Sequence, residues 1–313
     1  MKKVLLATTA LVASAGFAAA EVSVSGSAEM GVIGGDRYAT DDVQFHNDFD
    51  IGIDASGETD GGLTFGYHIE IEETNGSGAI NGGLGSDNEA VFISGGFGTL
   101  TLGETDGAFD KRLKEVALAG GTIADDETEH AGYDGNGFFD GTEDNQVLRY
   151  DYSFGDIGFS ASMEQNDNGA GGDDIYGLGF SYDMDLASGI GLGFGLGYQA
   201  GGDDDFDAIG ASVYADFGNG FEAGLNYTDY EDDFGDASHV GVGVAYTMDA
   251  WTFAANYGEF DFDGDNDQSG FAVLVNYDLG GGAVIQAGYG SSSFDAAGVD
   301  DVESYSLGVA MSF

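Results

Sequence analysis

IGLGFGLGY, residues 190–198, alternates a bulky apolar side chain with glycine at every step. Successive side chains of a β-strand point to opposite faces, so this spacing predicts a strand with one apolar face and one bare face. A face made of glycine would weaken a strand of a soluble β-sandwich, because each face there carries side chains that either pack in the core or are polar. The segment therefore indicates another kind of β-protein.

The same alternation recurs along the chain, as in 63-LTFGYHIEIE-72 and 43-VQFHNDFDIGID-54. Each such segment predicts a strand with apolar side chains on one face and polar ones on the other. We predict sixteen strands, at 22–34, 42–56, 63–73, 88–95, 98–105, 146–154, 157–166, 174–184, 189–199, 207–217, 221–230, 238–248, 251–260, 269–279, 283–291 and 302–313.

The connectors between these strands alternate between short Gly/Asp turns and longer acidic loops, a pattern typical of a transmembrane antiparallel β-barrel. In lipid a sheet satisfies its backbone hydrogen bonds only when it is closed. The apolar face would then meet lipid, while the face of Gly, Ser, Asn and Asp would meet water in a channel too wide to be filled by side chains. A helical membrane protein is excluded, because no apolar run after Gly16 is long enough.

The composition narrows the possible partners. The chain has 57 Asp and Glu against 7 Lys and Arg, which repels the phosphates of nucleic acid.

Residues 1–20 have a basic start, an apolar stretch and a final Ala-Ala-Ala, the pattern of a cleaved signal peptide. Its removal takes away two lysines and no acid, so the net charge would change from −50 to −52. Residues 21–313 would form one barrel domain.

One connector, residues 105–145, is far longer than the others, and a structureless loop of that length is usually functional. It contains Lys111, Arg112 and Lys114, three of the seven basic residues of the chain. Residues 110–119 predict a short helix capped by Asp110, with an apolar stripe.

Several stretches resemble the general porins of Gram-negative bacteria, in particular the alphaproteobacterial type. They are EVSVSGSAEMGV at the predicted mature start, FGTLTLGETDGA before the long connector, LRYDYSFGDIGFSAS after it, and SYSLGVAMSF at the end. The resemblance covers nearly the whole chain. It implies a homotrimer of sixteen-stranded barrels in outer-membrane lipid and lipopolysaccharide, whose long third external loop folds inward. It also implies that Phe313 is the signal for the barrel assembly machinery.

By this resemblance, residues 105–145 are the constriction loop of the pore. Porins of this kind set loop acids against wall bases, whereas here the bases are on the loop, and the wall offers only Arg149 and Arg37. The loop bases either face wall acids across the pore, or clamp the loop by pairing with wall acids or with loop acids; both alternatives stay open. The candidate constriction residues are Asp106, Asp110, Lys111, Arg112, Lys114, Glu115, Arg149, Asp48, Asp50, Glu70 and Glu72.

Other motifs are weaker. Clustered carboxylates at Asp125, Asp126 and Glu127 allow weak Ca²⁺ binding as a hypothesis, without a full calcium-loop pattern. No other cofactor and no catalytic constellation is indicated, and the four scattered histidines are expected to be ordinary polar residues.

We expect a passive channel for ions and small hydrophilic solutes, weakly cation-selective unless most acids only decorate the outer loops. A structural or adhesive barrel is the alternative function.

Overall fold

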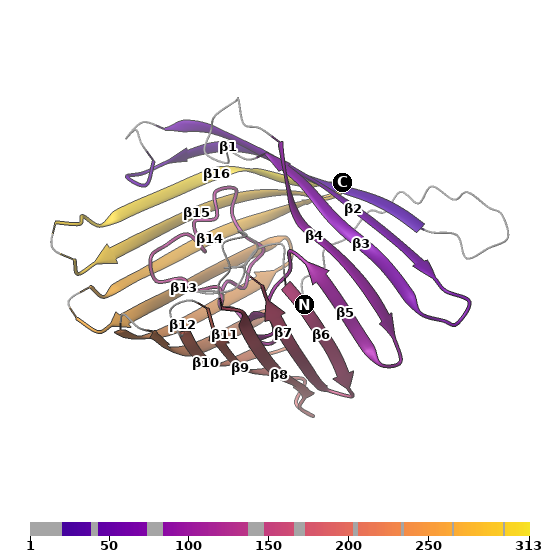
Figure 1. Cartoon of the computed structure of the whole chain (residues 1–313). Coiled ribbons are helices and arrows are strands. Elements are labelled where there is room, and N and C mark those ends of the chain that lie inside the picture. The colour runs from indigo at the N-terminus through magenta and orange to yellow at the C-terminus, as the bar shows by residue number, and fades with distance from the viewer. Residues whose placement is uncertain are drawn as a thin grey trace.

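Sixteen antiparallel strands form a closed barrel in the computed structural model of this chain (Figure 1). Residues 1–20, the predicted signal peptide, lie outside the described residues, as do residues 137–145 of the predicted constriction loop. The structure describes residues 21–38, 43–73, 84–136, 147–165, 173–202, 206–232, 235–264, 266–296 and 298–313.

The strands follow one another around the barrel in sequence order. Their bounds are β1 (Glu21–Gly34), β2 (Gln44–Glu58), β3 (Thr64–Glu73), β4 (Leu84–Gly95), β5 (Gly98–Gly103), β6 (Val147–Phe154), β7 (Ile157–Glu164), β8 (Ile175–Asp185), β9 (Gly191–Gly201), β10 (Phe206–Asp216), β11 (Phe221–Asp232), β12 (Gly235–Met248), β13 (Trp251–Phe262), β14 (Gln268–Gly280), β15 (Ala283–Phe294) and β16 (Val302–Ser312).

The first and last strands close the barrel. β1 pairs with β16 as well as with β2, and Gly31 lies opposite Gly308 in the ladder. The Gly26 N–H donates to the Phe313 carbonyl at 3.3 Å, and the Phe313 N–H donates back at 2.8 Å. Each of the sixteen described strands therefore pairs with a neighbour on both sides, and such closure is the condition for a sheet to cross a bilayer. The predicted sixteen-stranded antiparallel barrel is confirmed.

Strand β4 begins at Leu84, four residues before the predicted start at 88. The register between β3 and β4 shifts between His68 and Glu70, and Asn88 has a positive φ of 56°. An extra residue at such a bulge breaks the alternation of faces. The period-2 pattern therefore marks only the part of β4 that follows the bulge.

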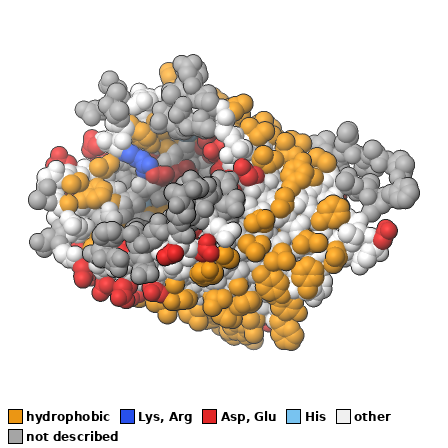
Figure 2. Space-filling view, viewed as in Figure 1, with side chains coloured by type: hydrophobic (Ala, Val, Ile, Leu, Met, Phe, Trp, Pro, Cys, Tyr) orange, Lys and Arg blue, Asp and Glu red, His pale blue; other side chains and the backbone are white. Residues whose placement is uncertain are grey.

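Large hydrophobic side chains lie on the outer face of the barrel, and small or polar residues lie on the inner face. In β9 the Leu196 side chain is 59% exposed, while Gly195 and Gly197 on the other face are buried. Figure 2 shows the hydrophobic side chains covering the outer wall, with acidic side chains along the rim. Apolar surface in water costs roughly 25 cal/mol per Å², so an exposed belt of this extent fits contact with lipid tails.

The predicted helix over 110–119 is wrong. Helix α1 is Ala108–Arg112, and its N-cap residue Gly107 has no side-chain capping bond, so Asp110 lies inside the helix. Leu113 is already extended, with φ −77° and ψ 164°. Beyond it the chain lies against the barrel wall, and those wall contacts replace further helical turns. Among the described residues no helix is long and apolar enough to cross a membrane.

Candidate functional site

The inner loop, which we define as residues 104–136, lies within the barrel (Figure 1). Its helix α1 packs against β7, β8 and β9. Further along, the Val116 carbonyl lies against Gly243 of β12, and the Ile123 side chain reaches Gly308 of β16. These wall glycines alternate with outward-facing hydrophobic residues, so the loop covers the lumen face from β7 round to β16. We expected such glycines to border water, and that expectation is wrong for those beneath the loop.

A hydrophobic cluster fixes the first part of the inner loop. Phe109 and Leu113 are both buried against the wall. Each contributes about 1.5–3 kcal/mol if its burial is complete. This cluster turns part of the barrel interior into a packed core, which holds the loop at a defined depth. Its other buried members are Phe206, Ala208, Tyr230 and Phe260.

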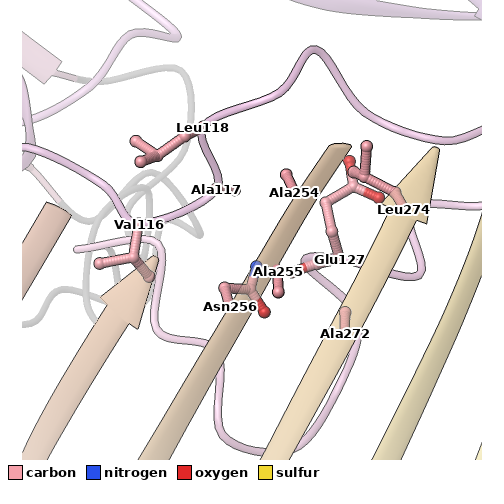
Figure 3. Close-up of a pocket in the computed structure, with 9 residues that line it drawn as sticks. All are labelled: Val116, Ala117, Leu118, Glu127, Ala254, Ala255, Asn256, Ala272 and Leu274. Carbon is pink, nitrogen blue, oxygen red and sulfur yellow. Dashed lines mark hydrogen bonds between the residues drawn. The ribbon is translucent and has the colours of Figure 1, made fainter. Parts of the chain in front are cut away.

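The middle of the inner loop lies over β13 and β14 (Figure 3). Val116 and Leu118 line one side of a small cavity there, and the wall residues Ala254 and Ala272 line the other side. The cavity left between them is about 10 Å³, roughly the space of one water molecule. The loop is therefore packed onto the wall rather than spanning open solvent.

Wall side chains also satisfy the backbone of the inner loop, as buried polar groups require. The Asn276 amide donates to the carbonyls of Ala119 at 3.1 Å and Gly121 at 2.9 Å. Other wall side chains bond the loop backbone in the same way. They are Ser212 to the Lys114 N–H (2.7 Å), Asn256 to the Glu127 carbonyl (2.7 Å), Ser292 to the Ala131 N–H (2.9 Å) and His239 to the Gly132 carbonyl (2.9 Å).

Arg112 ties the inner loop to β6 and β7. Its Nε donates to Ser160 Oγ at 2.7 Å and its Nη2 to the Phe159 carbonyl at 2.9 Å. Nη2 also lies 3.4 Å from Asp151 Oδ1, and only 14% of the Arg112 side chain is exposed. Burial lowers the pKa of Arg112, which Asp151 opposes. The geometry therefore gives Arg112 the clamp arrangement, with a wall acid as its partner.

Arg149, the predicted wall base, faces inward and is buried against the start of the inner loop. Its Nε donates to Asp151 Oδ2 at 2.9 Å and its Nη1 to Thr105 Oγ1 at 2.9 Å. Nη1 also bonds the Asp106 carbonyl oxygen, and it lies 3.7 Å from the Asp106 carboxylate. Asp151, which sequence reasoning missed, thus serves both arginines. Its place two residues after Arg149 on the same strand face was the available signal.

The two lysines of the basic cluster remain partly exposed. Lys111 Nζ lies 3.4 Å from the Asp106 carboxylate, with 42% of its side chain exposed. Lys114 Nζ lies 3.3 Å from Asp183 on β8, with 34% exposed. Exposed pairs of this kind are weak, so both ammonium groups stay available to the lumen. The structure thus separates one buried arginine from two accessible lysines.

The wall formed by β2 and β3 is acidic on its lumen face. Asp50 lies opposite Glu72 in the ladder, and Asp48 lies opposite Glu29 of β1. Glu70 accepts a bond of 2.7 Å from the Asn88 amide. Like charges directly opposite each other destabilise a sheet, so this arrangement has a local cost.

The acidic wall and the inner loop lie across the lumen from each other. In a closed ring of sixteen strands, strands eight places apart occupy opposite walls, so β2–β4 face β10–β12. Loop residues 113–118 rest on β9–β12 and therefore face the acids of the opposite wall.

Further acids extend this wall to the beginning of the inner loop. Glu104 follows β5, and its N–H donates to the Glu89 carbonyl at 3.0 Å. Burial, together with Asp87 and Glu89, raises the pKa of Glu104 to about 7. Its charge therefore changes near neutral pH.

The remaining candidate residues have other surroundings. Glu115 accepts a bond of 2.6 Å from the Tyr133 hydroxyl within the loop, and burial together with the Glu115 carboxylate raises the pKa of Tyr133. Arg37 is not on the wall; it lies in the β1–β2 connector, where it pairs with Glu129. Arg37 therefore ties the rim to the inner loop.

The predicted calcium carboxylates have different partners. Asp126 is fully buried and accepts bonds from the Thr122 and Ser306 hydroxyls. Glu127 accepts a bond of 2.9 Å from Thr122, and burial raises its pKa to about 7. Within the described part of the chain, no group of three or more Asp, Glu or His is arranged to hold a metal ion. The calcium hypothesis stays a prediction.

Two histidines expected to be ordinary polar residues are buried between the inner loop and the wall: His130 lies on the loop and His239 on β12. His130 Nε2 bonds Asn256 Oδ1 at 2.7 Å, and burial lowers the pKa of His130. His239 Nδ1 lies 3.5 Å from Asp134. The large His239 side chain among the small residues of β12 was a signal that something covers this wall.

Comparisons with known proteins agree with this geometry. A profile of the Gram-negative porin family matches residues 7–297. The porin of Rhodobacter capsulatus is 28% identical over 299 residues, covering 86% of this chain and 93% of that protein. A porin structure refined at 1.8 Å is similar with TM-score 0.72 at 25% identity, over 94% of this chain and 100% of that one. The anion-selective porin of Comamonas acidovorans shares the fold, with TM-score 0.65 at 15% identity over 94% of this chain and 100% of that one.

Proposed function

Because the chain belongs to the Gram-negative porin family, we propose that it conducts ions and small hydrophilic solutes passively through a water-filled channel of the outer membrane. Family and fold are those of non-enzymatic channels. The observation that carries the proposal is the inner loop, packed on one side of the lumen and facing an acidic wall. Such a loop narrows the barrel without filling it, so size exclusion at this level limits the solutes.

Weak cation selectivity is the finer part of the proposal. Two partly exposed lysines of the inner loop pair with Asp106 and Asp183, while the wall of β2 and β3 carries Asp48, Asp50, Glu70 and Glu72. A low-dielectric wall focuses the field of these acids into the lumen. Since a porin of the same fold is described as anion-selective, the fold does not set the sign of the selectivity. The lining charges would set it.

Single-channel recording in a planar bilayer tests both parts. The purified protein should give defined conductance steps, and a gradient of KCl should give a reversal potential on the cation-selective side. Absence of steps in a pure, folded preparation would contradict the channel. A reversal potential at zero or on the anion side would contradict only the selectivity.

The alternative function, a structural or adhesive barrel, predicts a folded barrel without conductance. An inner loop packed within the lumen gives such an anchor no advantage, which favours the channel. Liposome swelling in isosmotic sugar would separate the two functions without electrical recording, because an anchor leaves the vesicles sealed.

The remaining proposals concern assembly and follow from the family. We propose a homotrimer in a lipid and lipopolysaccharide leaflet, exported by the peptide at residues 1–20 and recognised by the assembly machinery through Phe313. The mass of the native complex tests the trimer, and deletion of Phe313 tests assembly in cells. Weak calcium binding at Asp125, Asp126 and Glu127 predicts a melting temperature that differs between calcium and EDTA.

A further inference from the structure

The inner loop lies so close to several wall glycines that a larger residue there would have to displace the loop or the wall. A Cβ on Gly179, Gly195, Gly243 or Gly258 would lie under 3.0 Å from a carbonyl oxygen of the inner loop, a distance that real Cβ atoms essentially never show. Glycine within a strand often marks the close approach of another backbone. We call these four residues the seating glycines.

At each seating glycine the atom nearest to the added Cβ is a backbone carbonyl oxygen of the loop, although side-chain atoms of Arg112 at Gly179 and of Ser212 at Gly195 also come within 3.0 Å. On Gly243 the added atom would meet the carbonyl oxygen, carbonyl carbon and Cα of Val116. No rotamer change relieves such a contact, so one backbone has to move. Ordinary contact between such atoms needs about 3.5 Å, which means a displacement of the order of 1 Å.

The loop yields more easily than the wall. Gly243 lies in the middle of β12, which is paired along its length with β11 and β13. Loop residues 113–121 have no helix or strand of their own. With the wall behind it, the loop has room to move only toward the lumen.

We propose that the seating glycines are specificity-determining positioning residues, which set the width of the passage by fixing how deeply the inner loop sits. This inference rests on the proposed channel function and adds to it. The lining charges would then act on ions in a passage whose width is set by wall residues on the far side of the loop. A single methyl group on the wall beneath the loop narrows the pore.

The ladder supplies a matched control. Gly224 is the direct cross-strand neighbour of Gly243, and both are buried on the lumen face. A Cβ on Gly224 would lie 3.3 Å from the Glu115 carbonyl oxygen and 3.6 Å from a Leu118 methyl, so a slight shift accommodates it. Gly243→Ala and Gly224→Ala therefore share chemistry, depth and strand context, and differ in the loop contact.

The test is single-channel conductance of wild type, Gly243→Ala and Gly224→Ala in concentrated KCl, where screening suppresses charge effects. We expect Gly243→Ala to show a loss of conductance beyond the spread of wild-type steps, and Gly224→Ala to match wild type. Unchanged or larger conductance in a folded Gly243→Ala barrel would overturn the inference. Failure of wild type to conduct would instead overturn the proposed function.

A second variant covers failure of Gly243→Ala to fold. A Cβ on Gly195 would meet the Arg112 carbonyl oxygen, the Oγ of the wall residue Ser212 at 2.5 Å and, at 2.8 Å, the Leu113 Cα. Folding of each variant is checked by the heat-dependent gel mobility of the barrel. Folded Gly195→Ala with wild-type conductance would overturn the inference even without Gly243→Ala.

Discussion

Arg112 on the inner loop and Asp151 on β6 form an ion pair 39 residues apart in sequence, with Nη2 3.4 Å from Oδ1. The pair is mostly buried and is supported by the Ser160 and Phe159 bonds. Because its side chain is buried and paired, Arg112 holds helix α1 against the wall. Lys111 and Lys114 are partly exposed, so their charges can act on ions in the lumen.

Arg112→Gln should loosen the inner loop, because the shorter side chain loses bonds to a charged donor. Such bonds contribute about 1.5–3 kcal/mol. We expect a lower free energy of unfolding in urea and noisier single-channel traces. Lys111→Gln is the control and should leave both unchanged. Equal stability of the two variants would contradict the clamp.

Replacing Lys111 and Lys114 together by Gln should increase cation selectivity, since it removes two accessible positive charges from the inner loop. Exposed charges interact by roughly 0.2–1 kcal/mol, so we expect the cation-to-anion permeability ratio to rise about twofold. Reversal potentials in a KCl gradient measure it. An unchanged potential would mean that both lysines act only within their ion pairs with Asp106 and Asp183.

Asp50→Asn with Glu72→Gln should decrease cation selectivity, because both carboxylates lie on the lumen face opposite the loop. The difference from wild type should be large in 0.01 M salt, where the screening length is about 30 Å, and small in 1 M, where it is about 3 Å. Reversal potentials at both concentrations test this. An effect that does not depend on salt would indicate a change of pore shape instead.

Glu127 should make stability depend on pH. Burial raises its pKa from 4.5 to about 7, so the folded protein holds this proton more tightly than the unfolded chain. The free energy of unfolding contributed by this group therefore falls as pH rises from about 4.5 to about 7, and is constant above and below.

Glu127→Gln should remove this part of the slope, measured as urea midpoints across that pH range. Glu58→Gln, at the exposed end of β2, should keep it. A slope shared by all three proteins would show that other groups cause the pH dependence.

How far the sequence predicts the site can be judged from particular residues. The inward direction of Arg149 and the acids of β2 and β3 follow from alternation, because each side chain has only two faces to choose from. The partners of Arg112 do not follow, since Asp151 and Ser160 come from strands beyond the loop. The helix at 110–119 was wrong for the same reason: local propensity favours continuing it, but contacts with the wall end it at Arg112.

By itself the sequence determined the barrel, its strand number and the sides of its wall, because alternation and turn spacing are local properties that a closed sheet in lipid requires. Only the tertiary structure decided where the inner loop lies. The sequence alone does not show whether a wall glycine faces water or another backbone, because that depends on which distant segment folds against it. That contact gives Gly243 and its cross-strand neighbour Gly224 different roles.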